Sequence, residues 1–543
     1  MSDDVLDAAV FGRLVRARAE QEPDRLALIF ENNELPEERV TLADIAIQGN
    51  KLAAELQRAG LRKGDRVAIM LRNHPEFVYG LAAHSQLGLV NVSIDPRTRS
   101  EKLRYLLDFS ECSSMIVADY ILADEDVAAV IRASGVRAYA LSTPEGRVQG
   151  LDVGGWRSLN EILDAAEQPD AGQHVHDVDD IWLLAFTSGT TGDPKGILFE
   201  YHRTAFYQYL PRFVGYRDDD IPYTGLSLSH GNALVVTMYP AITGAVSHSV
   251  FSRWFTKTRL WDVCAKYGCT TWANLGGIAT AIYSEPPSPK DRAHKVRLVA
   301  SAGMPRELWE PFEQRFGVRV IEWYGTTEGI AFAYNPVDVG PIGSFGKPPE
   351  GFIEMDVVAE DGQSVAPGEV GELIARPVGK PAVLDYYRNP SASQMKIRDG
   401  WLHTGDMCRR DADGWLFYAH RKEEGALRKM GEYISDGFIR RVLAEDPDVV
   451  DVAIYGVPAR SGAPGESEIV VAVVVRDRTS FDPAALFERC AARLERSHVP
   501  DFIQVVDEID KTPSGKVQSR FLAERFARER ESVFERPAAA GSR

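Results

Sequence analysis

A short loop rich in glycine and hydroxyl side chains follows an apolar run near the middle of the chain. The run Ile181 to Phe186 predicts a buried strand, and it leads into the sequence TSGTTGDPKGILF, which ends at Phe199. Glycine lets backbone N–H groups approach a ligand closely, and successive N–H groups form a concavity that binds anions. The loop therefore predicts a polyphosphate site, and a plain polar turn between two strands is the alternative. The residues expected to bind phosphate are Thr187, Ser188, Gly189, Thr190, Thr191, Gly192 and Lys195.

Length and charge narrow the class of protein. A chain of 543 residues is too long for one small core, so we expect more than one domain. The formal net charge of −17 argues against a general nucleic-acid binder. The five cysteines show no spacing typical of a metal site, and we expect reduced thiols. The N-terminus lacks a signal pattern and no apolar run is long enough to cross a bilayer, so we expect a cytoplasmic protein, with peripheral membrane contact left open.

The order of hydrophobic patterns predicts an α/β fold. Helical and strand patterns alternate over residues 41–118, beginning with a helix capped by Thr41 and ended by Gly60, and this alternation favours a parallel sheet covered by helices. Residues 134–180 read as a loop-rich connection. The predicted organisation is a large N-terminal domain, 1–420, made of two doubly wound subdomains (1–180 and 181–335) and a small β-barrel (336–420), followed by a mobile α+β domain, 421–543.

The loop sequence TSGTTGDPKG resembles the phosphate-binding signature of the AMP-forming adenylating enzymes, which include acyl-CoA synthetases, peptide-synthetase adenylation domains and beetle luciferases. Further motifs similar to those of the family follow in family order, so the resemblance covers residues 40 to 520 approximately. These motifs are SAGMP at 301–305, IEWYGTTEG at 321–329, GWLHTGD at 400–406 and TPSGK at 512–516.

The resemblance implies a nucleotide site built from these motifs. A tyrosine can stack on a purine, and a carboxylate with two oxygens suits the two ribose hydroxyls. The implied adenine and ribose contacts are Gly303, Met304, Pro305, Glu322, Tyr324, Asp406, Tyr418 and Arg421. Thr327 is implied as a phosphate contact, and Glu328 as a ligand of Mg²⁺.

The C-terminal motif carries the implied catalytic cation. In the resemblance, Lys516 bridges the substrate carboxylate and the α-phosphate while negative charge moves onto the leaving pyrophosphate. Residues 420–435 resemble the family's hinge and its following loop with one extra residue. The implied hinge is Glu423, with Lys422 as the alternative, and Gly431 belongs to the loop at the thiol tunnel. The small domain is expected to rotate between two steps of the reaction.

The residues expected around the acyl group are His230, Asn274 and Gly325. His230 gates the pocket in the resemblance, and a buried core histidine is the alternative. Acetate-specific relatives carry a bulky indole where this chain has Gly325, so the pocket is expected to be longer. Its expected walls are apolar or small, with Asn274 as the polar exception, which predicts a medium or bulky hydrophobic monocarboxylic acid. A carnitine-like zwitterion is the alternative.

The resemblance implies an enzyme that uses ATP, Mg²⁺ and coenzyme A. A carboxylic acid is first converted to acyl-AMP with release of pyrophosphate, and a thiol then takes the acyl group. The predicted function is a free-standing AMP-forming acyl-CoA synthetase, monomeric or homodimeric. Two alternatives are a ligase that delivers the acyl group to a phosphopantetheinyl carrier protein and a binding protein without turnover. Intact Lys516, Glu328 and Asp406 disfavour the last.

Overall fold

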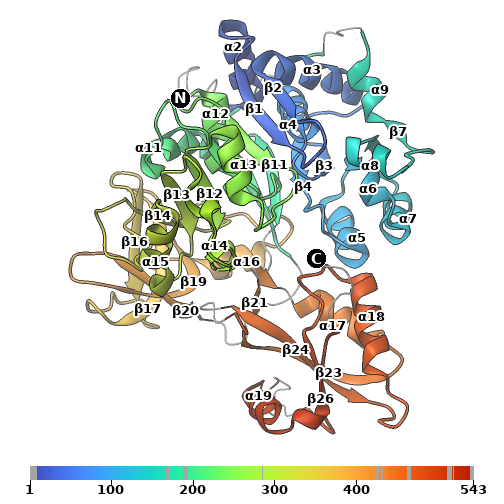
Figure 1. The fold of residues 1–543 in the computed structure, drawn as a ribbon, viewed down its shortest axis with the longest axis vertical. Coiled ribbons are helices and arrows are strands. Elements are labelled where there is room, and N and C mark those ends of the chain that lie inside the picture. Colours follow the sequence, from blue (N-terminus) through green and yellow to red (C-terminus); the bar gives the residue numbers. More distant parts are fainter. Residues whose placement is uncertain are drawn as a thin grey trace. The chain divides into compact units, whose positions relative to one another are not determined.

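A computed structural model describes most of the chain (Figure 1). The described residues are 9–166, 171–174, 176–186, 194–283, 285–422, 427–429, 432–434, 436–461, 466–509, 517 and 519–537. They fall into two compact units. The first combines Met1–Pro96, Leu106–Phe186 and Gly196–Ala419, and the second combines Arg97–Tyr105, Thr187–Lys195 and His420–Arg543. The mixture of sheets and helices confirms the predicted α/β class, while the domain boundaries proposed from the sequence stay predictions.

One sheet of the first unit has the strand order β7-β6-β5-β3-β4-β8-β9. All its pairs are parallel except β8 with β9, which flank the predicted phosphate loop. The strands are β3 (Arg66–Met70), β4 (Val90–Ser93), β5 (Ser114–Ala118), β6 (Arg137–Leu141), β7 (Arg157–Ser158), β8 (Ile181–Phe186) and β9 (Gly196–Glu200). The helices of this part are α3 (Leu42–Arg58), α4 (Pro75–Leu87), α5 (Ser100–Ser110), α6 (Asp119–Leu122), α7 (Glu125–Ser134), α8 (Pro144–Val148) and α9 (Leu159–Asp164). The prediction of a loop-rich connection over 134–180 was wrong, because β6, β7, α8 and α9 lie within it.

The start and end of helix α3 could be predicted from local sequence signals. The Thr41 hydroxyl accepts a hydrogen bond from the Asp44 backbone N–H, and the Asp44 carboxylate accepts one from the Thr41 N–H, so a capping box starts the helix. The helix ends at Arg58, and Gly60 follows with a positive φ of 91°. A left-handed residue after the last turn favours glycine, so the predicted end is confirmed to within two residues.

A second sheet of the first unit has the order β15-β14-β13-β12-β10-β11-β1-β2. It draws β1 and β2 from the N-terminal part of the chain, whereas β8 and β9 extend the other sheet. Its strands are β1 (Leu26–Glu31), β2 (Glu38–Thr41), β10 (Pro222–Thr224), β11 (Ser249–Ser252), β12 (Thr271–Leu275), β13 (Leu298–Ala302), β14 (Arg319–Gly325) and β15 (Phe332–Asn335). The helices here are α2 (Phe11–Gln21), α10 (Tyr201–Thr204), α11 (Leu210–Val214), α12 (Tyr239–Thr243), α13 (Leu260–Tyr267), α14 (Gly276–Tyr283) and α15 (Arg306–Phe316), with a π-helical turn at Ala233–Met238 and 3₁₀ turns at Ala205–Tyr209 and Pro289–Arg292.

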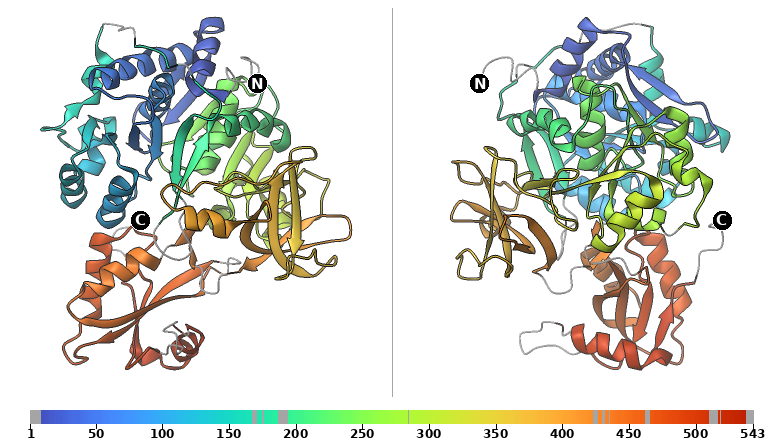
Figure 2. Two further views of the ribbon diagram at one scale, coloured as in Figure 1. Left: turned by 180° about the vertical axis from the view of Figure 1, so that it is seen from behind. Right: turned by 60° about the vertical axis from the view of Figure 1, so that its left-hand side comes forward.

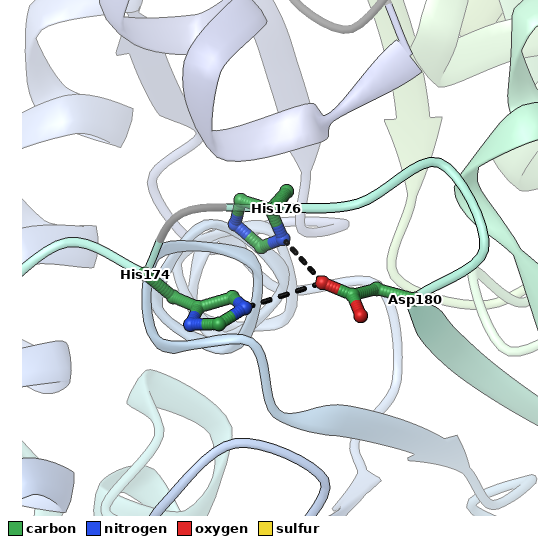
Figure 3. A group of neighbouring side chains, drawn as sticks. All are labelled: His174, His176 and Asp180. Carbon is green, nitrogen blue, oxygen red and sulfur yellow. Dashed lines mark hydrogen bonds and ion pairs between the residues drawn. The ribbon is translucent and has the colours of Figure 1, made fainter.

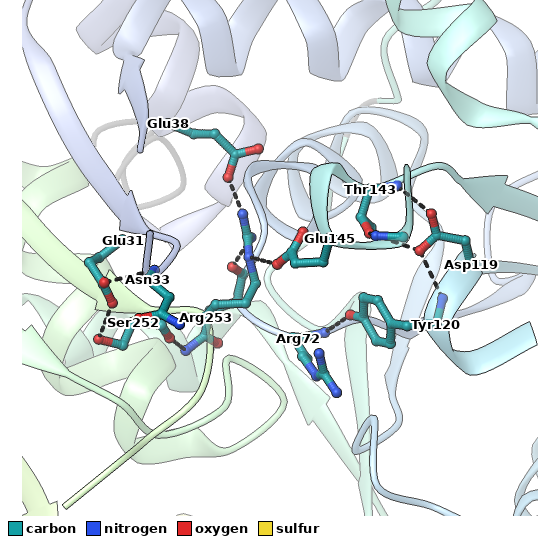
Figure 4. A network of polar contacts seen from close by, with 12 residues as sticks. Glu31, Asn33, Glu38, Arg72, Asp119, Tyr120, Thr143, Glu145, Ser252 and Arg253 are labelled. Atoms are coloured by element: carbon teal, nitrogen blue, oxygen red, sulfur yellow. Dashed lines mark hydrogen bonds and ion pairs between the residues drawn. The ribbon is translucent and has the colours of Figure 1, made fainter. Parts of the chain in front are cut away.

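A buried arginine links the elements of these two sheets (Figure 4). The guanidinium of Arg253, just after β11, donates to Glu38 and to the backbone carbonyl of Asn73, and its Nε lies 2.7 Å from Glu145 Oε1. Asn73 in turn accepts the N–H of Leu228 at 2.9 Å. Removing one partner of a buried ion pair costs about 3–5 kcal/mol, so this network fixes the segment that precedes His230.

An antiparallel sheet completes the first unit; its strands are gold to brown in Figure 2. The strands are β16 (Ile353–Val358), β17 (Val370–Pro377), β18 (Ile397–Arg398), β19 (Trp401–Arg410) and β20 (Leu416–Arg421), and α16 (Pro390–Lys396) precedes β18. They follow the order β16-β17-β19-β18, and β20 also pairs with β19. Among the described residues of the whole chain, none of the helices has both the length and the apolar character to cross a membrane.

The second unit is built on a four-stranded sheet with helices on both faces. Its elements are β21 (Leu427–Lys429), β22 (Glu432–Ile434), α17 (Asp436–Ala444), β23 (Val449–Pro458), β24 (Ser467–Val475), α18 (Pro483–Arg493), β25 (Phe502–Val505), α19 (Ser519–Arg528), a 3₁₀ turn at Arg530–Ser532 and β26 (Val533–Glu535). Side chains alternate along β24: Ile469 and Val471 pack with α17 and α18, while Val470 packs with α19. The period of two in this apolar strand therefore gives both faces of the sheet a core.

Candidate active site

Three parallel strands bring predicted site residues side by side. In the register of β12, β13 and β14, Asn274 lies opposite Ser301, and Ser301 lies opposite Glu322. Asn274 and Ser301 are the next-to-last residues of their strands, and Glu322 is the middle residue of β14. The crevice outside the carboxyl ends of parallel strands is where open α/β sheets bind their ligands. The two polar motifs expected around adenine, SAGMP and IEWYGTTEG, thus share one edge of the sheet.

Glu322 holds the first of these motifs in place. Its Oε2 accepts the backbone N–H of Met304 at 3.0 Å, and its Oε1 accepts the N–H of Gly303. Gly303 has a φ of 94°, a conformation that favours glycine, and Pro305 caps the N-terminus of α15. The buried Glu322 carboxylate therefore fixes the backbone of the turn. Its implied role as an adenine contact stays a prediction.

Tyr324 and Asp406 join two motifs that are far apart in the sequence. The Tyr324 hydroxyl donates to Asp406 Oδ2 at 2.5 Å, and the ring centroids of Tyr324 and Phe345 lie 4.7 Å apart. Asp406 is buried, and its backbone N–H donates to the Thr404 hydroxyl at 3.0 Å. Tyr418, on β20, is exposed. The ring expected to stack on adenine is thus hydrogen-bonded to the carboxylate expected to meet ribose.

Glu328 is oriented by residues that the motifs did not predict. Its Oε1 accepts the hydroxyl of Tyr386 at 2.8 Å, and its backbone carbonyl accepts Nη1 of Arg203 at 3.0 Å. Glu328 is half-buried, and Thr327 beside it is exposed. Mg²⁺ is commonly held by one or two carboxylates together with substrate phosphates, and an oriented, accessible carboxylate fits that demand. Tyr386 lies outside every recognised motif, so no local signal identified it.

His230 is not a core residue. Its side chain is exposed, and its Nδ1 accepts the backbone N–H of Asn232 at 3.1 Å. The alternative of a buried core histidine was therefore wrong, and its role as a gate stays a prediction. Gly325, at the end of β14, is also exposed; a Cβ there would lie 3.2 Å from Cζ3 of Trp323. A side chain at this position would crowd that indole, so glycine keeps the strand end open.

Asn274 and Ser301 are buried polar residues with unsatisfied side chains. Asn274 is 0% exposed, and among the described residues neither its Oδ1 nor its Nδ2 has a hydrogen-bond partner. The same holds for the Ser301 hydroxyl on the neighbouring strand and for Oδ1 of Asn232, whose Nδ2 donates to the Asn274 carbonyl at 3.4 Å. Buried polar groups in proteins are nearly always paired. A cluster of such polar groups without partners among the described residues, at the carboxyl ends of β12 and β13, indicates a place for a polar ligand group. Sequence analysis singled out Asn274 only.

Several predicted residues cannot be placed. Thr187, Ser188, Gly189, Thr190, Thr191, Gly192, Glu423, Gly431 and Lys516 lie outside the described residues, as does the side chain of Arg421. Lys195 is described, half-buried and part of the second unit, where the Tyr105 hydroxyl donates to the carbonyl of its neighbour Pro194 at 3.0 Å. Lys422, the alternative hinge, is exposed.

Comparison with known sequences gives a consistent family. The AMP-binding enzyme family matches residues 15–387, and the AMP-binding enzyme C-terminal domain matches residues 440–516. Sulfoacetate–CoA ligase of Cupriavidus necator is 32% identical over 93% of this chain and 96% of its own length. Medium/long-chain-fatty-acid–CoA ligase of Mycobacterium tuberculosis is 29% identical over 94% and 84%. Crotonobetaine/carnitine–CoA ligase of Salmonella typhimurium is 26% identical over 92% and 96%.

Solved structures confirm the fold. A double mutant of o-succinylbenzoate CoA synthetase from Bacillus subtilis has a TM-score of 0.77 at 22% identity, covering 94% of this chain and 98% of that one. A fatty acyl CoA synthetase of Mycobacterium tuberculosis has a TM-score of 0.63 at 22% identity, covering 96% and 99%. The α/β architecture and its small C-terminal domain are shared with these proteins. Together with the family match over most of the chain, this shows that the protein belongs to the AMP-binding enzyme family and is an AMP-forming ligase of the acyl-CoA synthetase type.

Proposed function

We propose that this acid–CoA ligase forms its acyl-adenylate at the carboxyl ends of β12, β13 and β14. The observation that carries the proposal is the hydrogen bond from Tyr324 to Asp406, because it joins the stacking ring to the ribose-binding carboxylate. Glu322 adds a fixed backbone at Gly303 and Met304, along which adenine would lie. Pro305, Tyr418 and Arg421 complete the adenine and ribose contacts proposed from the resemblance.

The charged groups have separate tasks. Mg²⁺, when bound, offsets the negative charge of the phosphates, and Glu328 would hold it with the orientation that Tyr386 provides. Thr327 would donate its hydroxyl to a phosphate. Lys195 and Lys516 are assigned from the resemblance: adenylation brings a carboxylate against a phosphate, and cationic donors stabilise the charge that develops there.

Thiol transfer is assigned to coenzyme A. The resemblance places Gly431 at the thiol tunnel and the hinge at Glu423, with rotation of the small domain between the two steps. Delivery to a phosphopantetheinyl carrier protein is the alternative. The proposed location is the cytoplasm: all five cysteines are buried and no disulfide links any of them among the described residues, and reduced thiols are typical of a reducing compartment. We propose a monomer or a homodimer.

Pyrophosphate exchange tests this proposal. With the right acid and Mg²⁺, the enzyme should incorporate labelled pyrophosphate into ATP without any thiol. Acyl-CoA should form only when CoA is added. Exchange without acyl-CoA formation would favour the carrier-protein ligase. If no acid in a broad panel supports exchange, the protein is not a ligase of this kind.

Two classes of acid are candidates for the substrate. The first is a medium or bulky hydrophobic acid: Gly325 leaves the strand end open, and one relative is named for medium- and long-chain fatty acids. Each methylene that is fully buried would add about 0.8 kcal/mol of binding free energy. The second class carries another polar group besides its carboxylate. The amide of Asn274 and the hydroxyl of Ser301, which have no hydrogen-bond partner within the described part of the chain, favour it, and two relatives are named for sulfoacetate and for crotonobetaine/carnitine.

A substrate panel with one variant separates these classes. The panel is acetate, octanoate, benzoate, sulfoacetate and carnitine, compared by kcat/KM. Asn274→Leu replaces the amide by an apolar side chain of similar size. If the acid is polar, this variant should lose activity toward the preferred acid and gain relative activity toward octanoate. A wild-type preference for octanoate or benzoate that Asn274→Leu leaves intact would establish the hydrophobic class.

A further inference from the structure

A second cluster of ligand-type side chains lies away from the nucleotide motifs. The segment before β8 carries His174, His176 and Asp180, which point toward one another in Figure 3. His174 Nε2 lies 3.2 Å from Asp180 Oδ2, and His176 Nδ1 lies 3.9 Å from the same oxygen. All three ligand atoms lie within 4.8 Å of one another. None of these residues has a role in the proposed reaction.

His176 presents a lone pair to this cluster. The residue is 6% exposed, and one ring nitrogen donates to the backbone carbonyl of Ser85. The other, Nδ1, has no hydrogen-bond partner among the described residues. A neutral imidazole that donates from Nε2 carries its lone pair on Nδ1, which here faces a carboxylate oxygen.

The backbone and neighbouring residues hold the other two ligands. The His174 N–H donates to the Gln86 carbonyl at 2.9 Å, and its ring packs over Gly88, where a Cβ would lie 2.7 Å from His174 Cδ2. Asp180 Oδ2 also accepts the Asp177 N–H at 2.9 Å, and Lys63 pairs with Oδ1. The lysine thus binds one carboxylate oxygen and leaves the other directed at the histidines.

We propose that His174, His176 and Asp180 form a structural site for a divalent transition-metal ion, for which Zn²⁺ is the best match. Two imidazole nitrogens and one carboxylate oxygen are typical Zn²⁺ ligands, with bonds of about 2.0–2.2 Å that place neighbouring ligand atoms about 3.3–3.6 Å apart in a tetrahedron. The distances of 3.2 and 3.9 Å bracket that spacing. The fourth position would hold water. The bond from His176 to the Ser85 carbonyl is the outer contact that usually orients a ligating histidine. The ion would cross-link residues 174–180, and the hydrogen bonds of His174 and His176 to the carbonyls of Gln86 and Ser85 hold this segment against the end of α4.

Metal titration of the full-length protein tests the site. After removal of metals with a chelator, Zn²⁺ is titrated by calorimetry, and Co²⁺ by the visible bands of its tetrahedral complexes. We expect one equivalent to bind. His174→Gln and His176→Gln should each weaken affinity by more than about tenfold. His202→Gln is the matched control, because His202 pairs with Asp179 at 3.3 Å on the surface and should leave affinity unchanged.

Thermal unfolding distinguishes a variant that lacks one metal-ligating side chain from a variant that does not fold. In chelator, the circular dichroism spectrum and the Tm should be similar for wild type, the ligand variant His176→Gln and the control His202→Gln. Added Zn²⁺ should raise the Tm of wild type and His202→Gln, since a ligand that binds only the native state stabilises it. It should not raise the Tm of His176→Gln. Absence of Zn²⁺ binding by the wild type, or equal affinity in wild type and His176→Gln, would overturn the proposal.

Discussion

The Tyr324 hydroxyl donates a hydrogen bond of 2.5 Å to Asp406 Oδ2. One residue comes from the end of a strand in the large second sheet, and the other from β19 of the antiparallel sheet. Their contact therefore joins these two of the three sheets of the first unit at the place where a nucleoside would lie. It also restrains the tyrosine ring, which reduces the conformational entropy that stacking on adenine would otherwise remove.

Tyr324→Phe keeps the ring and removes the hydrogen bond. Without this hydrogen bond the ring must become ordered when adenine binds, which costs about 0.5–1.5 kcal/mol, so we expect ATP affinity to fall roughly two- to tenfold. Calorimetric titration with ATP or AMP measures this loss. Tyr209→Phe is the control, because Tyr209 is an exposed tyrosine outside the motifs. ATP affinity equal to that of the wild type would remove this contact from the nucleotide site.

Lys516→Ala should separate the two half-reactions. The lysine is assigned to the transfer of the acid onto the α-phosphate, where it stabilises developing charge. Acyl-AMP formation should drop by orders of magnitude, while transfer of the acyl group from supplied acyl-AMP to CoA should continue. Rapid-quench assays of each step measure this. Lys511→Ala, a change in the same segment, should affect neither step. Equal losses in both steps would contradict the role of Lys516.

Glu328→Gln should change the dependence on Mg²⁺. The substitution keeps the shape of the side chain and removes the charge of the proposed ligand, so more Mg²⁺ should be needed for half-maximal activity and kcat should fall. Tyr386→Phe removes only the hydrogen bond that orients the carboxylate and should show a weaker effect in the same direction. A Mg²⁺ titration of initial rates decides. Identical curves for wild type and Glu328→Gln would exclude Glu328 as a ligand.

Local signals in the sequence were sufficient for much of the fold. The capping box of Thr41 with Asp44 and the glycine after α3 placed that helix correctly, because both act within one turn. The strand β6, Arg137–Leu141, was missed. Its run RAYAL is short and weakly alternating, and it is a strand because it pairs with β5 on one side and β7 on the other. The pairing of β1 with β11 likewise joins segments over two hundred residues apart, which no local pattern encodes.

In the candidate site, too, some residues could be predicted from local motifs and others only from the tertiary structure. The motifs that resemble those of the family predicted site roles for Tyr324, Glu328 and Asp406, and these roles stay predictions. Tyr386 orients Glu328 only through tertiary packing. The same packing buries the Ser301 hydroxyl at a place where the described residues offer it no hydrogen-bond partner. The histidine pair at His174 and His176 was visible in the sequence, but only the fold shows that Asp180 faces both.

The buried His84 should lower the free energy of unfolding as the pH falls below neutral. His84, in the last turn of α4, is almost fully buried, and its Nδ1 lies 3.2 Å from Asn91 Oδ1. The amide nitrogen of Asn91 donates to the Ser93 hydroxyl, so its oxygen is the acceptor and His84 Nδ1 carries the hydrogen. The other ring nitrogen has no partner among the described residues. Burial lowers the pKa of His84 to about 4, because the protonated ring would lose its hydration.

The sign of the effect follows from proton binding. The unfolded chain, with a histidine pKa near the ordinary 6.5, binds more protons than the native state between pH 6.5 and 4, so the free energy of unfolding falls as the pH falls through that window. In His84→Gln this contribution disappears. The free energy of unfolding should therefore fall less between pH 7 and 4 than in the wild type, by up to about 3 kcal/mol. Urea unfolding at pH 7, 5 and 4 measures the difference, with His202→Gln as an exposed control. Parallel curves for wild type and His84→Gln would show that the buried imidazole does not govern the acid response.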